Sequence, residues 1–93
     1  MLSLSPIDFS KVSKEDAAKE ALRLGISAEL DAISLYEQLA AALEEEGIKK
    51  VFMDIAKEEK THVGEFQALL LEKDAEQERE LKNGKDEVEE LTK

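Results

Sequence analysis

Two stretches of this sequence repeat apolar residues at alternating spacings of three and four, which predicts two amphipathic helices. We expect the first over residues 13–46 and the second over 48–73. The inward stripe of the first comprises Leu22, Gly25, Glu29, Ala32, Tyr36, Leu39 and Leu43, and that of the second comprises Ile48, Phe52, Ile55, Glu59, His62, Phe66 and Leu69. Each stripe is apolar except at a few positions near its middle.

Local signals place the ends of these helices. Ser13 followed by Asp16 resembles a capping box at the start of the first helix. Gly47 suits a left-handed cap at its end, and so short a connection makes the two helices pack antiparallel as a hairpin.

The flanking segments are short. Residues 1–12 contain Ser-Pro and mixed polarity, and we expect an extended lead-in. Asp74 suits the N-cap of a short third helix over 75–83, which Asn83-Gly84 would stop. The remaining tail, 84–93, would either add a helical turn or fray. The chain of 93 residues is therefore predicted to be one all-α domain. A lone hairpin of this length has little core, so self-association is expected.

Three polar residues occupy the inward stripes: Glu29, Glu59 and His62. A carboxylate buried without a partner is very costly, and the stripes offer no Lys or Arg to pair with it. Glu59 and His62 are three residues apart and project from one face. A Glu on one helix and Glu-x-x-His on another make half of the site of ferritin-like di-iron bundles. Two copies would form a four-helix bundle with the whole site. The alternative is that these are a hydrogen-bonded core histidine and salt-bridge partners.

The chemistry of these groups favours iron. Carboxylate oxygen and imidazole nitrogen suit iron, manganese or zinc, but structural zinc sites use more Cys and His, and the chain has no Cys and one His. The pair Glu58 and His62 is less suitable because Glu58 falls on the flank of the stripe.

A length comparison bears on which chain supplies each ligand. With Gly47 as the turn, Glu29 lies farther before it along the chain than Glu59 or His62 lies after it. At ~1.5 Å per residue the mismatch is about 9 Å for Glu59 and about 5 Å for His62. We therefore expect no compact site within one hairpin. A partner chain's Glu would complete the site, and the sequence leaves open which chain's Glu29 joins which Glu59.

Other positions on the first helix are secondary candidates. Tyr36 lies two turns beyond Glu29 and would hydrogen-bond a ligand, supply an electron, or simply pack. Gly25, one turn before Glu29, either allows close approach or ligand space, or is an ordinary small core residue. A second, partly apolar face suggests a further subunit contact; it comprises Leu24, Ala28, Asp31, Leu35, Gln38 and Ala42.

Composition excludes several classes of function. The formal net charge of −10 argues against nucleic acid and against anionic membranes. An acidic surface concentrates cations, although solubility alone would also explain the charge. No segment is long and apolar enough for a membrane span, the start does not read as a secretory signal, and the absence of Cys fits a reducing cytoplasm.

The runs Ala28-Glu29-Leu30-Asp31-Ala32-Ile33-Ser34-Leu35-Tyr36-Glu37 and Glu58-Glu59-Lys60-Thr61-His62-Val63-Gly64-Glu65-Phe66 resemble the encapsulated ferritins. The likeness is especially close to the ferritin-like domain that some archaea fuse to the N-terminus of an encapsulin shell protein. It implies two-helix subunits that dimerise around a di-iron ferroxidase centre, with further assembly into a ring of ten.

Carried over residue by residue, the resemblance makes Glu29, Glu59 and His62 the ferroxidase ligands and Tyr36 the neighbouring tyrosine. Asp31 corresponds to an acidic metal-entry site. Some members of the family have an acid where this chain has Ala28, and a tryptophan where it has Leu35. These two differences concern the entry site rather than the di-iron centre.

The function implied is oxidation of Fe(II) to Fe(III) with oxygen as acceptor, and delivery of iron into a cytoplasmic encapsulin nanocompartment. No encapsulation peptide is visible, so fusion or truncation is expected. The alternative is a metal-stapled helical assembly module without turnover. A peroxide-reducing protein of the rubrerythrin kind ranks lower, because such proteins usually carry a Cys site or additional ligands.

Overall fold

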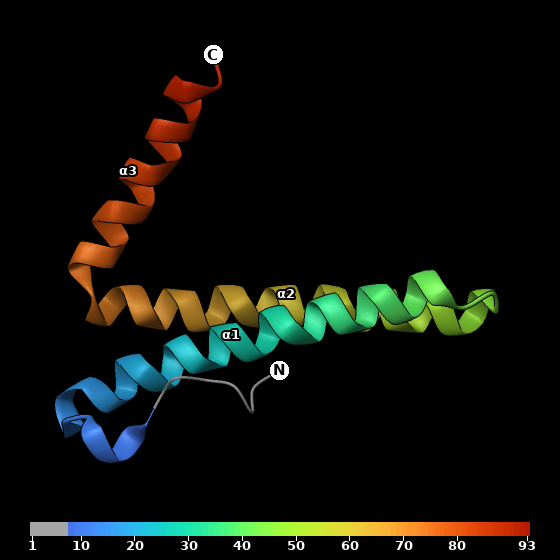
Figure 1. Cartoon of the computed structure of the whole chain (residues 1–93), viewed down its shortest axis with the longest axis horizontal. Coiled ribbons are helices and arrows are strands. Elements are labelled where there is room, and N and C mark those ends of the chain that lie inside the picture. Colours follow the sequence, from blue (N-terminus) through green and yellow to red (C-terminus); the bar gives the residue numbers. More distant parts are fainter. Residues whose placement is uncertain (1–7) are drawn as a thin grey trace.

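The computed structural model describes residues 8–93, which contain helices and no strand. A 3₁₀ turn, η2 (Phe9–Lys11), precedes three α-helices: α1 (Lys14–Ala42), α2 (Glu46–Lys73) and α3 (Ala75–Leu91). The prediction of an all-α chain with a hairpin is confirmed (Figure 1). None of the helices in residues 8–93 has the length and apolar character needed to cross a bilayer.

The end of the lead-in is folded rather than extended. Asp8 accepts hydrogen bonds from the backbone N–H of Ser10 at 3.0 Å and from its hydroxyl at 2.6 Å. The N–H of Lys11 donates to the carbonyl of Asp8 at 3.1 Å. An Asp side chain that bonds backbone two residues on closes a turn of this kind, so the extended prediction is wrong here. The rest of the lead-in, residues 1–7, lies outside the described residues.

The start of α1 is as predicted, but its end is not. The Ser13 hydroxyl accepts from the N–H of Asp16 at 3.2 Å, which is the expected N-cap. However, α1 ends at Ala42, and Leu43 leaves it with extended backbone. Gly47 lies inside the first turn of α2, and no glycine of the described chain has positive φ. The predicted left-handed cap at Gly47 is therefore wrong.

The helix dipole explains where the turn falls. Three consecutive acids, Glu44, Glu45 and Glu46, follow the apolar stripe of α1. At the C-terminus of α1 they would face its negative end, whereas at the N-terminus of α2 they face a positive end. The chain leaves α1 before these acids, and α2 begins among them.

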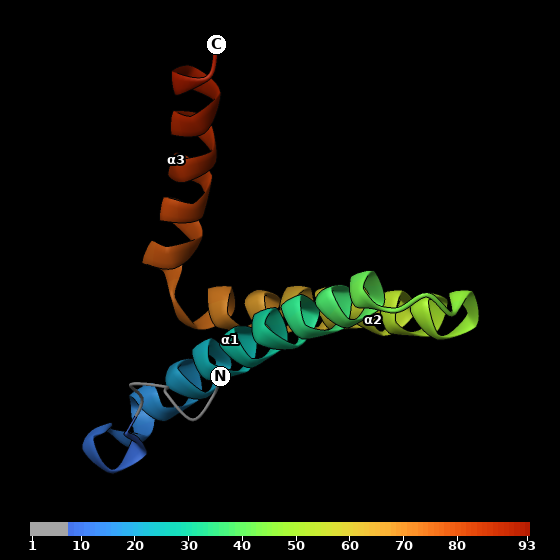
Figure 2. The same ribbon diagram turned by 45° about the vertical axis from the view of Figure 1, so that its right-hand side comes forward.

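The hairpin has almost no interior of its own. In both views α1 and α2 lie side by side near their connecting loop and diverge toward their other ends (Figures 1 and 2). Within the described chain only Ala40, Ala56 and Leu70 are buried, while large apolar side chains such as Val51 and Leu69 are about half exposed. A surface of this kind favours a partner, and the predicted dimeric bundle stays a prediction.

Helix α3 stands away from the hairpin in both views (Figures 1 and 2). Asp74 caps it as predicted, accepting from the N–H of Gln77 at 3.0 Å. Arg23 of α1 binds the same carboxylate at 3.2 Å and also holds Glu20 at 2.9 Å. These contacts hold the α2–α3 junction against α1.

The predicted stop at Asn83-Gly84 and the separate tail are wrong, because α3 continues to Leu91. The amide of Asn83 donates to the carboxylate of Glu80 at 3.3 Å, one turn back, instead of bonding a helix end. Gly84 costs a helix about 1 kcal/mol relative to Ala, and the charged helix formers on both sides outweigh that cost.

Candidate metal centre

Glu29 of α1 and Glu59 and His62 of α2 converge at the middle of the hairpin. One ligand atom from each residue can be chosen so that all lie within 4.8 Å of one another. Nδ1 of His62 lies 3.3 Å from Oε2 of Glu59 and 3.5 Å from Oε2 of Glu29. The hairpin therefore brings together the three polar residues of the inward stripes.

This convergence within one chain corrects the length comparison made from the sequence. Glu29 lies as many residues before the end of α1 at Ala42 as Glu59 lies after the start of α2 at Glu46. The two carboxylates thus stand at equal depth from the loop. The expected mismatch of about 9 Å arose because the turn was placed at Gly47 instead of Leu43–Glu45.

The cluster has more negative charge than the described residues around it neutralise. The side chains of Glu29 and Glu59 are only 18% and 19% exposed. In residues 8–93, the one basic group within ion-pair distance of either is His62. Both carboxylates approach the same Nδ1 atom, which carries at most one proton. Oε2 of Glu29 is buried and has no hydrogen-bond partner.

These donors fit a transition metal such as iron. A buried carboxylate oxygen without a partner is costly, and a cation bound between two carboxylates and an imidazole would satisfy it. Carboxylate and imidazole ligands suit iron or manganese. His62 is 43% exposed, so the cluster opens on one side of the hairpin. Residues 8–93 offer three donor residues here, and a partner chain could supply further ligands from that open side.

Tyr36 lies outside the cluster. Its ring stacks on Phe52 with centroids 6.0 Å apart and an interplanar angle of 24°. Tyr36 lies as far before Ala42 as Phe52 lies after Glu46, so these two also stand at equal depth. Tyr36 is two turns from Glu29, a rise of about 10 Å. The sequence singled out Tyr36 but not this partner, although Phe52 lies on the facing stripe.

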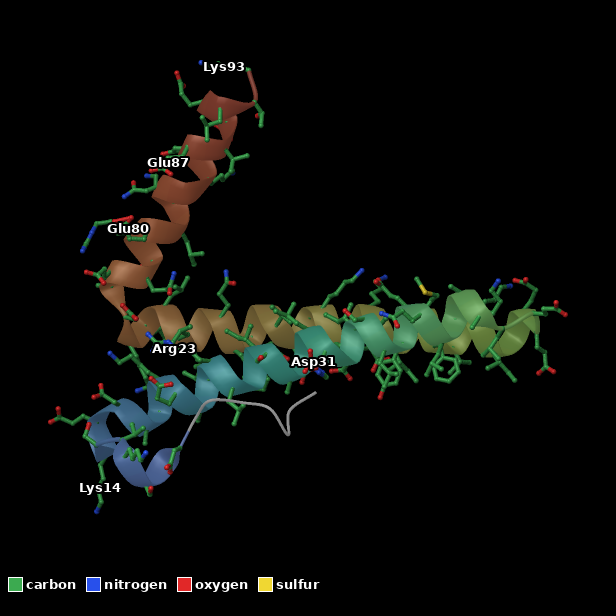
Figure 3. The ribbon with its side chains drawn as sticks, viewed as in Figure 1. Lys14, Arg23, Asp31, Glu80, Glu87 and Lys93 are labelled. Atoms are coloured by element: carbon green, nitrogen blue, oxygen red, sulfur yellow. The ribbon has the colours of Figure 1, made fainter. Side chains whose placement is uncertain are left out.

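Asp31 and Glu58 are also separate from the cluster. Asp31 is exposed at mid-length of α1 (Figure 3). It is two residues after Glu29 and so about 200° around the helix from it. Glu58 is exposed as well, and the group of potential ligands contains Glu59 instead.

A helical hairpin with a Glu on one helix and Glu-x-x-His on the other matches half of a ferritin-like di-iron bundle, so the class of protein that fold and site indicate is ferritin-like. Comparison with known proteins agrees. Residues 20–93 match the family described as Rubrerythrin. The chain is similar to "Crystal structure of encapsulated ferritin domain from Pyrococcus furiosus", with a TM-score of 0.84, 53% identity, and coverage of 97% of this chain and 90% of that chain.

The chain is also 54% identical over 94 residues to the "Ferritin-like-encapsulin shell fusion protein" of Pyrococcus furiosus. The match covers 99% of this chain and 27% of that protein, so the chain spans about a quarter of the curated relative it matches. This chain belongs to the encapsulated ferritin domains, within the rubrerythrin-like family. The resemblance found in the sequence is confirmed.

Proposed function

We propose that this protein is a ferroxidase, which oxidises Fe(II) to Fe(III) with oxygen as acceptor at a di-iron site shared between two chains. The observation that carries the proposal is the cluster of Glu29, Glu59 and His62, in which a buried carboxylate oxygen lacks a hydrogen bond. A ferritin-like di-iron site takes a Glu from each of two helices and Glu-x-x-His from each of two others. One hairpin supplies half of this set, so two copies supply all of it.

The ligand residues would act on the iron substrate through charge and position. Glu59 from both chains would bridge the two ions, His62 would bind one ion in each half, and Glu29 would complete each set. Oxidation removes one electron from each Fe(II), which oxygen accepts. The two chains together contribute four carboxylates, and this negative charge stabilises Fe(III) more than Fe(II).

A second copy is supported by the surface of the hairpin. Ile48, Val51 and Leu69 of α2 and Leu39 of α1 are large apolar residues, each more than one third exposed. Ile48 and Leu69 belong to the same inward stripe as Glu59 and His62. A partner that buries them would also cover the open side of the cluster. We extend the proposal to a ring of such dimers, a decamer, as the family resemblance implies.

Two further residues enter the proposal through the resemblance. Tyr36 would be the tyrosine that neighbours the ferroxidase centre. Asp31 would attract Fe(II) before it reaches the centre. The matched relative is by its name a fusion with an encapsulin shell. We therefore propose that this domain works in the cytoplasm inside an encapsulin compartment, to which it delivers Fe(III).

The decisive experiment compares neighbouring acids on one helix. Fe(II) is added without oxygen to the wild type, Glu59→Gln and Glu58→Gln, and the Fe(III) absorbance is followed after air is admitted. We expect Glu59→Gln to oxidise Fe(II) at least about tenfold more slowly, and Glu58→Gln to match the wild type. Equal rates in all three proteins would contradict the proposal.

The second candidate function is a metal-stapled assembly module without turnover. The near absence of a buried core favours it, because a metal between two hairpins would supply the missing stability. Native mass spectrometry with and without Fe(II), combined with an oxygen electrode, separates the two functions. Metal-dependent dimers that consume no oxygen would favour the module.

A further inference from the structure

The ring of Phe66 on α2 lies against the backbone of α1 at Gly25. A Cβ atom built on Gly25 would stand 3.2 Å from Cδ2 and Cε2 of Phe66 and 3.4 Å from Cζ. Such distances are shorter than ordinary carbon contacts of about 3.5–4.0 Å. Any side chain at position 25 would therefore push the ring, or the two helices, apart.

This contact lies one turn from the metal centre on both helices. Gly25 is four residues before Glu29, and Phe66 is four residues after His62. Residues four apart lie on the same face of a helix, and a helical side chain leans toward the N-terminus of its own helix. The Phe66 ring thus leans from its own turn toward the turn that carries His62.

We propose that the contact between Phe66 and Gly25 sets the separation of α1 and α2 at the metal centre, which makes Gly25 a positioning residue for Glu29. This inference rests on the proposed metal site. The three ligand atoms fit within 4.8 Å only while the helices stay close, and a displacement of a few tenths of an ångström is large compared with the tolerance of a metal–ligand distance, about 0.2 Å.

The other glycines lack this steric role. A Cβ built on Gly64, also in α2, meets no atom within 4 Å, and the same is true at Gly47 and Gly84. All four glycines are helical, and none has positive φ. Gly25 and Gly64 both lie in helix interiors, where a change to Ala brings a similar gain in helix propensity, and the close contact with Phe66 is present at Gly25 alone of the two.

The test compares Gly25→Ala with Gly64→Ala in the full chain, using Co(II) as a non-oxidising probe. Co(II) affinity is measured by titration, and the d–d absorption bands report the arrangement of its ligands. We expect Gly25→Ala to weaken Co(II) binding on the order of tenfold and to shift the bands. Gly64→Ala should keep both the affinity and the spectrum of the wild type.

A rescue variant shows that the effect is steric. Phe66→Leu in the Gly25→Ala background removes the ring atoms that a new Cβ would meet, and it should restore most of the Co(II) affinity and the original bands. Denaturant midpoints of the metal-free proteins should rise for Gly64→Ala and rise less, or fall, for Gly25→Ala.

The outcomes separate this inference from the proposed function. If the wild type binds Co(II) and Glu59→Gln does not, but Gly25→Ala behaves like Gly64→Ala, the positioning role is wrong and the metal site remains. If the wild type binds Co(II) no better than Glu59→Gln, the metal site itself is wrong, and the positioning role fails with it.

Discussion

Nδ1 of His62 lies 3.5 Å from Oε2 of Glu29, across the interface between the two helices of the hairpin. The same nitrogen lies 3.3 Å from Glu59 on its own helix. One imidazole proton cannot serve both carboxylates, and the buried oxygen of Glu29 lacks a hydrogen bond. The metal-free hairpin thus keeps an arrangement that a bound cation would satisfy.

Removing the charge of Glu29 should stabilise the metal-free protein. In Glu29→Gln the amide donates to Glu59 instead of repelling it, and we expect a gain of about 1 kcal/mol in the free energy of unfolding. Added Fe(II), kept anaerobic, should raise the stability of the wild type by roughly 2.7 kcal/mol at 100 times the dissociation constant. The variant should show little of this rise. Urea unfolding with and without Fe(II) measures the stability of each metal-free protein and its rise with metal. If metal-free Glu29→Gln is less stable than the wild type, the claim that the Glu29 carboxylate is unsatisfied is wrong.

Gly84→Ala should stabilise α3. Position 84 is helical with negative φ, and an added Cβ meets nothing within 4 Å. The gain in helix propensity of about 1 kcal/mol should slow amide hydrogen exchange around residues 81–88 by roughly fivefold. Gly47→Ala, in α2, is the control and should leave exchange in α3 unchanged. Faster exchange in Gly84→Ala would mean that the helix breaks at Asn83-Gly84 after all.

Substitutions of Tyr36 should separate its ring from its hydroxyl. Tyr36→Phe keeps the stack on Phe52, so the free energy of unfolding should change by less than about 0.5 kcal/mol. Tyr36→Leu removes the stack and should cost about 1 kcal/mol. Chemical denaturation of the metal-free proteins tests the ordering. A slower Fe(II) oxidation in Tyr36→Phe, at unchanged stability, would assign a role to the hydroxyl.

The α2–α3 junction should respond to acid through Asp74. The backbone N–H of Gln77, with help from Lys19 and Arg23, holds the pKa of this carboxyl below its ordinary value of 3.8. A depressed pKa means that Asp74 contributes fully to stability above pH 3.8, and that this contribution is lost as the pH falls through the lowered value.

We therefore expect wild type and Asp74→Ala to differ in helicity of α3 at neutral pH and to converge in strong acid, well below pH 3.8. Circular dichroism of both proteins from pH 7 to pH 2 measures this difference. Glu76→Ala, next in the first turn of α3, serves as a control for loss of one negative charge near the helix N-terminus. A difference that persisted unchanged at the lowest pH would rule out the ionised carboxylate as its source.

The sequence was most informative where a polar residue occupies an otherwise apolar helix face. Glu29, Glu59 and His62 interrupt apolar stripes, and an interruption of this kind is visible in one dimension because helical spacing assigns each residue a face. The caps at Ser13 and Asp74 were equally readable, since their hydrogen bonds involve backbone only three residues away.

The sequence was less informative where two local signals compete. Gly47 and Gly84 both suggest a helix end, yet both lie within helices. The run of acids from Glu44 to Glu46 decides the first case through the helix dipole. In the second, the strong helix formers around Gly84 outweigh the cost of a single glycine.

By itself, the sequence determined the presence of the helices, the three polar residues of the candidate metal cluster and the acidic character of the chain, because these depend on side-chain type and on spacing along one helix. Only the tertiary structure decided that Glu29 stands level with Glu59, that Tyr36 stacks on Phe52, and that Phe66 rests on Gly25. Each of these depends on the register between two helices. A shift of the turn by a few residues slides one helix along the other by several ångströms, and at this loop two local signals, Gly47 and the acids Glu44–Glu46, indicate different positions for the turn.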